Sequence, residues 1–367
     1  MGRATGTIGS RFGADPNALN FVRLVLALQV AVWHAYALRS GTWLPERLEL
    51  FSADIAVDGF FAVSGFLICR SWCRNPNLLR FVEARATRLL PGLWVCLIVT
   101  AFVIAPLATH AAGDPGISLR GQLEFVLGNA TTWVNAWGID GGPTGVSHPG
   151  AWNGSLWSLS WEVGAYAALA IVGVFALLRG RVVLWLAAAF RLWAFALVVS
   201  GSWVVNSGHW VWLFPRTGLM FACGALLYVF RDRIPMSRLL AVVAVALVAA
   251  GVAATPSYRV IAAPAIAYLC LYVGIELGRF RRLVLRNDLS YGVYIYAFPI
   301  QQALLLAGFG SIGWAAFVCL SVACTLPLAA ASWFAVERPA QRFRRQGYRG
   351  EPSAFDRSIP QPLHEPH

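Results

Sequence analysis

Long apolar stretches recur along this chain of 367 residues, separated by short polar or arginine-rich segments. A helix that crosses a membrane needs about 20 consecutive, mainly apolar residues. The pattern therefore predicts an all-α, polytopic membrane protein with about ten transmembrane helices. The predicted helices cover residues 20–40, 52–70, 89–107, 156–178, 182–203, 210–230, 238–255, 259–278, 289–308 and 312–334.

The polar segments suggest how the chain is organised. A segment at residues 1–19 precedes a membrane domain at 20–338, and a polar, proline-rich tail at 339–367 is expected to be disordered at its end. The one long connection, residues 108–155, contains the break Gly141-Gly142-Pro143. No soluble domain is evident, so any chemistry must take place in or against the bilayer.

Composition and charge support this reading. Hydrophobic residues make up 58% of the chain and charged residues 13%, whereas a soluble domain has about 25% charged residues. All 29 basic residues are arginine. If both termini are cytoplasmic, 23 arginines fall on the cytoplasmic side or at helix feet and four fall outside, as the positive-inside rule requires. The arginines do not gather on one stripe, so the net charge of +12 does not indicate a nucleic-acid partner.

Several ionisable residues fall inside predicted helices, where they are costly and usually mark function or an ion pair. In the predicted orientation, His34, Asp58, Glu162 and Arg216 all lie in the outer half of the membrane. Arg23 precedes His34 by about 16 Å along the same helix, near the cytoplasmic foot. A neutral histidine can take a proton from a hydroxyl, and a carboxylate on its other nitrogen would fix its tautomer. We expect either Asp58 or Glu162 to do so; the alternative is an ion-pair network that only holds helices together.

A second group lies toward the cytoplasmic side. Arg85 and Arg88 are three residues apart and share one helix face, a spacing that suits phosphate oxygens. Simple positive-inside anchoring would explain the same pair. Trp157 and Trp161, at the outer mouth of the fourth predicted helix, are candidates for acceptor contact together with Arg216. The alternative for both tryptophans is the interfacial aromatic belt. The histidines are too scattered to predict a metal site.

These residues resemble the landmarks of a known family, the membrane acyltransferase-3 group, which O-acylates surface polysaccharides and related glycans. Six pieces occur in the family's order between residues 23 and 339 and are jointly specific. They are Arg23 with His34 after ten intervening residues, the motif at 57–68, Arg85-x-x-Arg88 followed by Pro91, Trp157-Ser158-Leu159-Ser160-Trp161-Glu162, the motif at 290–294, and Val336-Glu337-Arg338-Pro339.

The resemblance implies a protein of the bacterial inner membrane that uses an acyl-CoA co-substrate, commonly acetyl-CoA, from the cytosol. It implies catalytic roles for Arg23 and His34 and donor handling by Arg85 and Arg88. The family often has a histidine where this chain has Ala297, so that residue's role does not transfer.

Together these patterns predict an integral membrane O-acyltransferase, and more narrowly an O-acetyltransferase. Its partners would be the lipid bilayer and a carbohydrate or lipid-linked glycan acceptor, with exopolysaccharide or an envelope glycan as the first expectation. A small glycosylated metabolite as acceptor stays open, as does the oligomeric state. The main rival is a transporter or flippase, because intramembrane charges are also typical of carriers.

Overall fold

The computed structural model describes residues 6–14, 16–42, 53–114, 116–175, 178, 180–199, 210–254 and 257–347. Within these ranges the protein is all-helical, as predicted. Strand-like pairing among them is limited to two isolated bridges, Thr7 with Pro235 and Ile139 with Gly142.

A helix lies in each of the ten predicted apolar stretches. These helices are α2 (Leu19–Ser40), α4 (Ala53–Arg74), α5 (Leu78–Val99), α8 (Trp157–Val174), α9 (Gly180–Val199), α11 (Trp210–Val229), α12 (Arg238–Ala254), α13 (Arg259–Glu276), α14 (Ser290–Leu306) and α15 (Trp314–Ser332). The smaller helices are α1 (Ile8–Ala14), α6 (Ala105–Ala112), α7 (Leu119–Asn129) and α16 (Arg338–Gly347). Two π-helical turns, η1 (Thr100–Ile104) and η6 (Trp333–Glu337), join α5 to α6 and α15 to α16.

Six helical segments of the described residues are long and apolar enough to cross a membrane. They are Leu19–Ser40, Asp54–Arg74, Leu78–Ala112, Gly154–Val174, Arg259–Arg279 and Trp314–Arg344. Two shorter apolar helices, Leu213–Val229 and Arg238–Ala254, accompany them. The count of about ten crossings and the cytoplasmic position of both termini stay predictions. The end of the predicted tail, after Gly347, lies outside the described residues.

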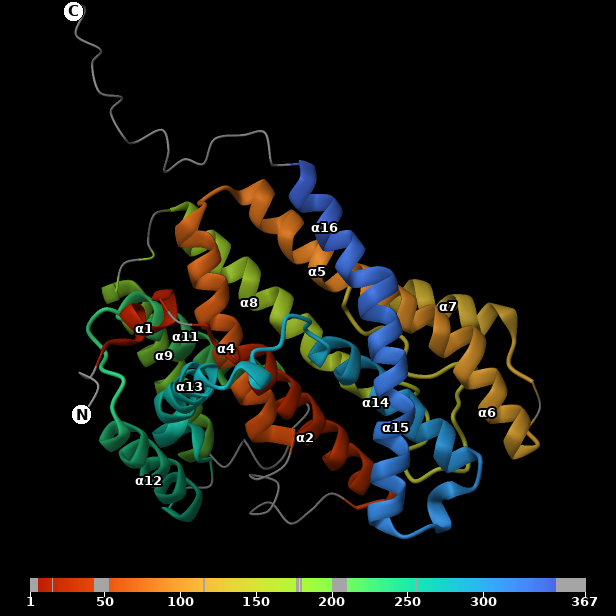
Figure 1. The fold of residues 1–367 in the computed structure, drawn as a ribbon. Coiled ribbons are helices and arrows are strands. Elements are labelled where there is room, and N and C mark those ends of the chain that lie inside the picture. Colours follow the sequence, from red (N-terminus) through yellow and green to blue (C-terminus); the bar gives the residue numbers. More distant parts are fainter. Residues whose placement is uncertain are drawn as a thin grey trace, which may run out of the picture.

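The centre of the molecule is built from α2, α4 and α14 (Figure 1). α14 packs between α2 and α15, and α4 packs against α2 and α11. α14 is the most continuously buried helix, with every residue from Ser290 to Pro299 buried. Polar side chains on these central helices are therefore shielded from the surroundings, and each must find a partner inside the protein.

The α4–α11 contact depends on two glycines. A Cβ atom on Gly65 would lie 2.0 Å from the carbonyl oxygen of Phe221, and one on Gly224 would lie 1.9 Å from that of Ala62. Only glycine fits such an approach of two helix backbones, and small residues commonly allow it between membrane helices. This contact brings Ser64 and Asp58 of α4 to the positions described below.

We expect Gly224→Ala to lower the free energy of unfolding by about 1–3 kcal/mol, because backbone cannot move aside as a flexible side chain would. The measurement is thermal unfolding of the purified protein in detergent. Gly164→Ala is the matched control, since a Cβ on Gly164 of α8 would meet no atom within 4 Å. Equal stability of the two variants would contradict the close approach of α4 and α11.

Candidate active site

The first polar cluster joins α2, α5 and α14 through one carboxylate. Asp288, two residues before α14, accepts hydrogen bonds at 2.6 Å from both Arg23 of α2 and Arg88 of α5. Arg88 also bonds to Glu337 of η6 at 3.0 Å, and Ser290 donates to Asp288. Burial alone would raise the pKa of Asp288, but the guanidinium groups of Arg23 and Arg88 outweigh this effect and lower the pKa to about 2. Asp288 is thus a fixed anion that holds the two arginines together.

Arg85 faces a different part of the structure from Arg88. Its guanidinium carbon lies 5.6 Å from the ring centre of Phe81 and 5.9 Å from that of Tyr166 in α8. Among the described residues Arg85 makes no ion pair, and its Nε atom is buried without a hydrogen-bond partner. It lines a largely apolar groove between α5 and α8 that extends from Phe81 to Trp94. The two arginines therefore face different neighbours, and Arg85 is the one of the pair that has no ion pair among the described residues.

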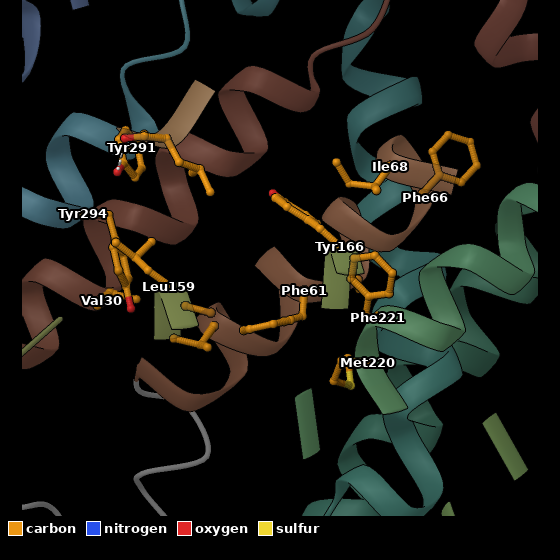
Figure 2. Close-up of a cluster of buried hydrophobic side chains, with 14 of the residues drawn as sticks. Val30, Phe61, Phe66, Ile68, Leu159, Tyr166, Met220, Phe221, Tyr291 and Tyr294 are labelled. Atoms are coloured by element: carbon orange, nitrogen blue, oxygen red, sulfur yellow. Dashed lines mark hydrogen bonds between the residues drawn. The ribbon is translucent and has the colours of Figure 1, made fainter. Parts of the chain in front are cut away.

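A polar cavity of about 40 Å³ lies next to the first cluster, between α2, α4, α8 and α14. Its polar lining consists of Arg23, Ser64, Ser158, Glu162, Ser290, Tyr291 and Tyr294. Figure 2 shows Tyr291 and Tyr294 side by side on α14, with Leu159 and Phe61 among the apolar side chains near them. Glu162 accepts a hydrogen bond from Ser64 at 3.2 Å and a short one from Tyr166, while Ser158 and Tyr294 bond to each other at 2.7 Å.

A second charge cluster lies between α4, α11 and α13. Asp58 is fully buried and bonds to Arg216 at 3.2 Å, to Arg259 at 2.6 Å and to Tyr258 at 2.5 Å. Asp54, one turn earlier, pairs with the same two arginines at 2.9 and 2.7 Å. Two carboxylates and two guanidiniums thus satisfy one another. Arg216 also lies over the ring of Trp157, at 5.8 Å from its centre.

His34 has a third, separate environment. Its side chain is buried, and its Nδ1 lies 3.5 Å from the hydroxyl oxygen of Ser155. Its ring packs against that of Phe298 in a T-shaped arrangement, with ring centres 5.3 Å apart. Ser155 belongs to the short 3-10 turn Gly154–Leu156 that leads into α8. His34 and Ser155 therefore lie about one helical turn from the end of the cavity formed by Ser158 and Tyr294, because Ser155 is three residues before Ser158 and Phe298 is four residues after Tyr294.

The sequence placed His34, Asp58, Glu162 and Arg216 at one depth, but in the structure they are divided among different polar clusters. The structure joins Arg23 to Arg88 through Asp288, and Asp58 to Arg216. Among the residues that the structure describes, neither Asp58 nor Glu162 hydrogen-bonds to His34, so the expectation that one of them fixes its tautomer is not met by this geometry. The contacts of Asp58 fit the ion-pair alternative. Trp161 lines an apolar cavity of about 250 Å³ between α8, α9 and α11, away from the polar one.

Sequence reasoning missed the partners of these residues. Asp288 lies two residues before the motif at 290–294 and Glu337 lies within the motif at 336–339, but neither was given a role. Arg259 was one of the four arginines counted outside the membrane. For Asp54 and Ser155, the sequence offered no indication of a role in the site except that each lies at the start of a predicted helix. Within the described ranges, no group of three or more His, Cys, Asp or Glu side chains could hold a metal ion.

The arrangement suits proton transfer and anion binding inside a helical membrane protein. A buried imidazole, a polar cavity with one carboxylate, and a cluster of two arginines paired with two carboxylates follow one another along α2 and α14. These are the groups that a transfer between an anionic donor and a hydroxyl acceptor requires.

Comparison with known proteins identifies the class. The family model described as "Acyltransferase domain" matches residues 17–334. An O-acetyl transferase of Shigella phage Sf6 is 31% identical over 333 residues, covering 88% of this chain and 95% of that protein. Nodulation protein 10 of Rhizobium leguminosarum bv. viciae is 28% identical over 378 residues, covering 89% and 94%. No solved structure matches the chain significantly.

The protein is therefore a multi-pass membrane acyltransferase. The chain belongs to the acyltransferase-3 family of membrane O-acyltransferases, which confirms the resemblance drawn from its motifs.

Proposed function

We propose that this protein is an O-acetyltransferase of the bacterial inner membrane that moves an acetyl group from acetyl-CoA to a hydroxyl of a carbohydrate. The acceptor would be an exopolysaccharide or another envelope glycan, free or lipid-linked. The observation that carries the proposal is the series of polar groups from Asp288 and Arg23, through the cavity, to His34. The similarity to an O-acetyl transferase along most of the chain supports the acetyl group.

The geometry supports entry of donor and acceptor from opposite sides. Arg23 and His34 are eleven residues apart on α2, which corresponds to about 16 Å. In the proposed topology the cluster of Arg23, Arg88, Asp288 and Glu337 faces the cytosol and His34 faces outward. A donor bound by its phosphates at Arg85, which has no ion pair among the described residues, could extend its thioester arm past the cavity toward His34.

The chemistry then needs one base and no covalent intermediate. His34 takes the proton of the acceptor hydroxyl while that oxygen attacks the thioester carbonyl carbon. The new C–O bond forms, the C–S bond breaks, and the released thiolate of CoA takes up the proton from the imidazolium. Arg23, which reaches from the Asp288 cluster to the cavity wall, supplies positive charge along the path of the donor arm, about 16 Å from His34. Glu162 lies in the cavity wall, where it can orient Ser64 and Tyr166.

We expect Arg85→Gln to raise the apparent KM for acetyl-CoA about tenfold or more with little change in kcat. The reason is that a hydrogen bond to a charged group contributes about 1.5–3 kcal/mol, and 1.4 kcal/mol corresponds to a factor of ten. Steady-state kinetics with varied donor give the measurement. Arg120→Gln, in an exposed pair with Glu124, is the control. An unchanged KM for the donor would mean that Arg85 only anchors its helix at the cytoplasmic side.

The activity itself is tested on the purified protein in detergent with radiolabelled acetyl-CoA and a bacterial surface glycan. Labelled glycan and free CoA should appear together. A transporter or flippase would leave the thioester intact, and that result would reject the proposal. The same assay with a glycosylated small molecule in place of the polysaccharide shows which of the two acceptor classes receives the labelled acetyl group.

The topology has its own test. A cysteine in place of Glu124, whose side chain is 62% exposed in the connection between α6 and α8, should react with a membrane-impermeant maleimide on intact cells. Labelling that needs lysis would overturn the proposed orientation. The unsubstituted protein corrects for its own cysteines, of which Cys73 and Cys319 are exposed.

A further inference from the structure

The segment Asn153-Gly154-Ser155 is bound to α14 at the level of His34. Asn153 is buried and its side-chain amide donates to the carbonyl oxygen of Ile295 at 2.8 Å, while its Oδ1 accepts from the backbone N–H of Ser155 at 3.3 Å. About two turns further along α14, the amide of Gln302 donates to the carbonyl oxygens of His148 and Ala151. The end of the long connection is therefore fixed to α14 by side chains that bond to backbone.

Gly154 shows how closely this segment approaches Phe298. A Cβ atom on Gly154 would lie 2.6 Å from the Phe298 ring. The same ring contacts the imidazole of His34. Gly154 and Phe298 thus place the following residue, Ser155, directly beside His34.

Ser155 is fully buried, and its hydroxyl lies 3.5 Å from Nδ1 of His34. This is the one hydrogen-bond partner that the described structure gives to His34. The distance is at the long end of the hydrogen-bond range, and such contacts often shorten once substrate is bound. In a neutral imidazole one ring nitrogen carries the proton and the other has the free electron pair, and the partner of one nitrogen determines the state of the other.

We infer that Ser155 is a positioning residue for His34: its hydroxyl oxygen accepts from Nδ1–H, which leaves Nε2 free to take the proton of the acceptor. The inference rests on the proposed role of His34 as the base. When Nε2 takes up a proton, the imidazolium keeps donating from Nδ1 to Ser155, so the same contact serves both states. Ser155 thereby occupies the place that the sequence assigned to Asp58 or Glu162.

The test combines kinetics with a readout of the tautomer. Ser155→Ala should lower kcat about fivefold to tenfold, the effect of losing one hydrogen bond, while both KM values change less than twofold. Ser155→Thr, which keeps the hydroxyl, should recover most of the lost kcat. Ser321→Ala is the matched control, because Ser321 is also a buried serine, but bonds only within α15 to the carbonyl oxygen of Phe317.

Nitrogen-15 spectra of histidine-labelled protein in lipid nanodiscs report the tautomer without any substrate. The signal of His34 is assigned by its loss in His34→Gln. It should show a protonated Nδ1 in the unsubstituted protein and a mixture of tautomers in Ser155→Ala. Should Ser155→Ala fail to fold, Ser155→Cys keeps the volume, weakens the acceptor and is measured in the same way.

The outcomes separate the two ideas. Full kcat in Ser155→Ala, or a protonated Nε2 in the unsubstituted protein, overturns the role of Ser155 while leaving the acetyltransferase proposal in place. Activity in His34→Gln would instead reject the base itself. A fall in kcat with a shifted tautomer and rescue by threonine supports the inference.

Discussion

His34→Gln is expected to lower the rate of acetyl transfer by a factor of about 10²–10⁴, the usual contribution of a general base. His34 lies near the end of the polar cavity formed by Ser158 and Tyr294, and its ring packs against Phe298 and faces the hydroxyl of Ser155. Glutamine has a similar size and can still reach Ser155, but it cannot accept a proton at neutral pH. The loss should therefore fall on kcat, with the KM values of both substrates nearly unchanged.

The measurement is initial-rate kinetics with labelled acetyl-CoA on detergent-purified protein. Thermal unfolding of the same samples should show no large loss of stability. His110→Gln is the control, because His110 lies at the end of α6, away from the cavity. If His34→Gln keeps more than a tenth of the rate, the base has to be sought elsewhere, and Glu162 in the cavity wall is the next candidate.

Asp58→Asn is expected to act on stability rather than on chemistry. It removes the carboxylate that bonds to Arg216, Arg259 and Tyr258 and leaves two buried guanidiniums with Asp54 as their one acidic partner in the described structure. Breaking a buried pair by removing one member typically costs about 3–5 kcal/mol, because the remaining charge is left uncompensated. The free energy of unfolding should fall by that amount.

A second substitution tests the cause. Asp58→Asn with Arg259→Gln restores a neutral cluster around Arg216 and Asp54, so the double variant should be less destabilised than the sum of the single variants. Asp232→Asn, in a surface pair with Arg231, is the control and should change stability by at most about 1 kcal/mol. An inactive but fully stable Asp58→Asn protein would show that Asp58 takes part in catalysis after all.

The sequence predicted the helices well because a membrane helix has a simple signature in one dimension. The stretches at 20–40 and 259–278 correspond to α2 and α13 within two residues at each end. The stretch at 89–107 was less accurate, because α5 begins at Leu78 with arginines and a glutamate that the hydropathy pattern excluded. Those polar residues are helical because Asn77 caps the helix and Arg88 finds partners in Asp288 and Glu337.

The sequence predicted the height of each site residue along its helix, but not which neighbouring helix its side chain faces. Residue spacing along a helix gives height in the membrane, and it correctly separated Arg23 from His34. It does not give the neighbour that a side chain faces, since this depends on how helices are rotated against one another. Asp58 therefore lies at a helix face that meets α11 and α13, and Ser155 reaches His34 through a loop whose path depends on Asn153 and Gly154.

The two charge clusters have an electrical consequence. The cluster of Arg23, Arg88, Asp288 and Glu337 contains two positive and two negative side chains, and so does that of Asp54, Asp58, Arg216 and Arg259. Moving one elementary charge through a membrane potential takes about 2.3 kcal/mol per 100 mV, but a group with zero net charge takes almost none. The two clusters can therefore shift during turnover without doing work against the cell's voltage, whereas Arg85, which has no ion pair among the described residues, would still respond to it.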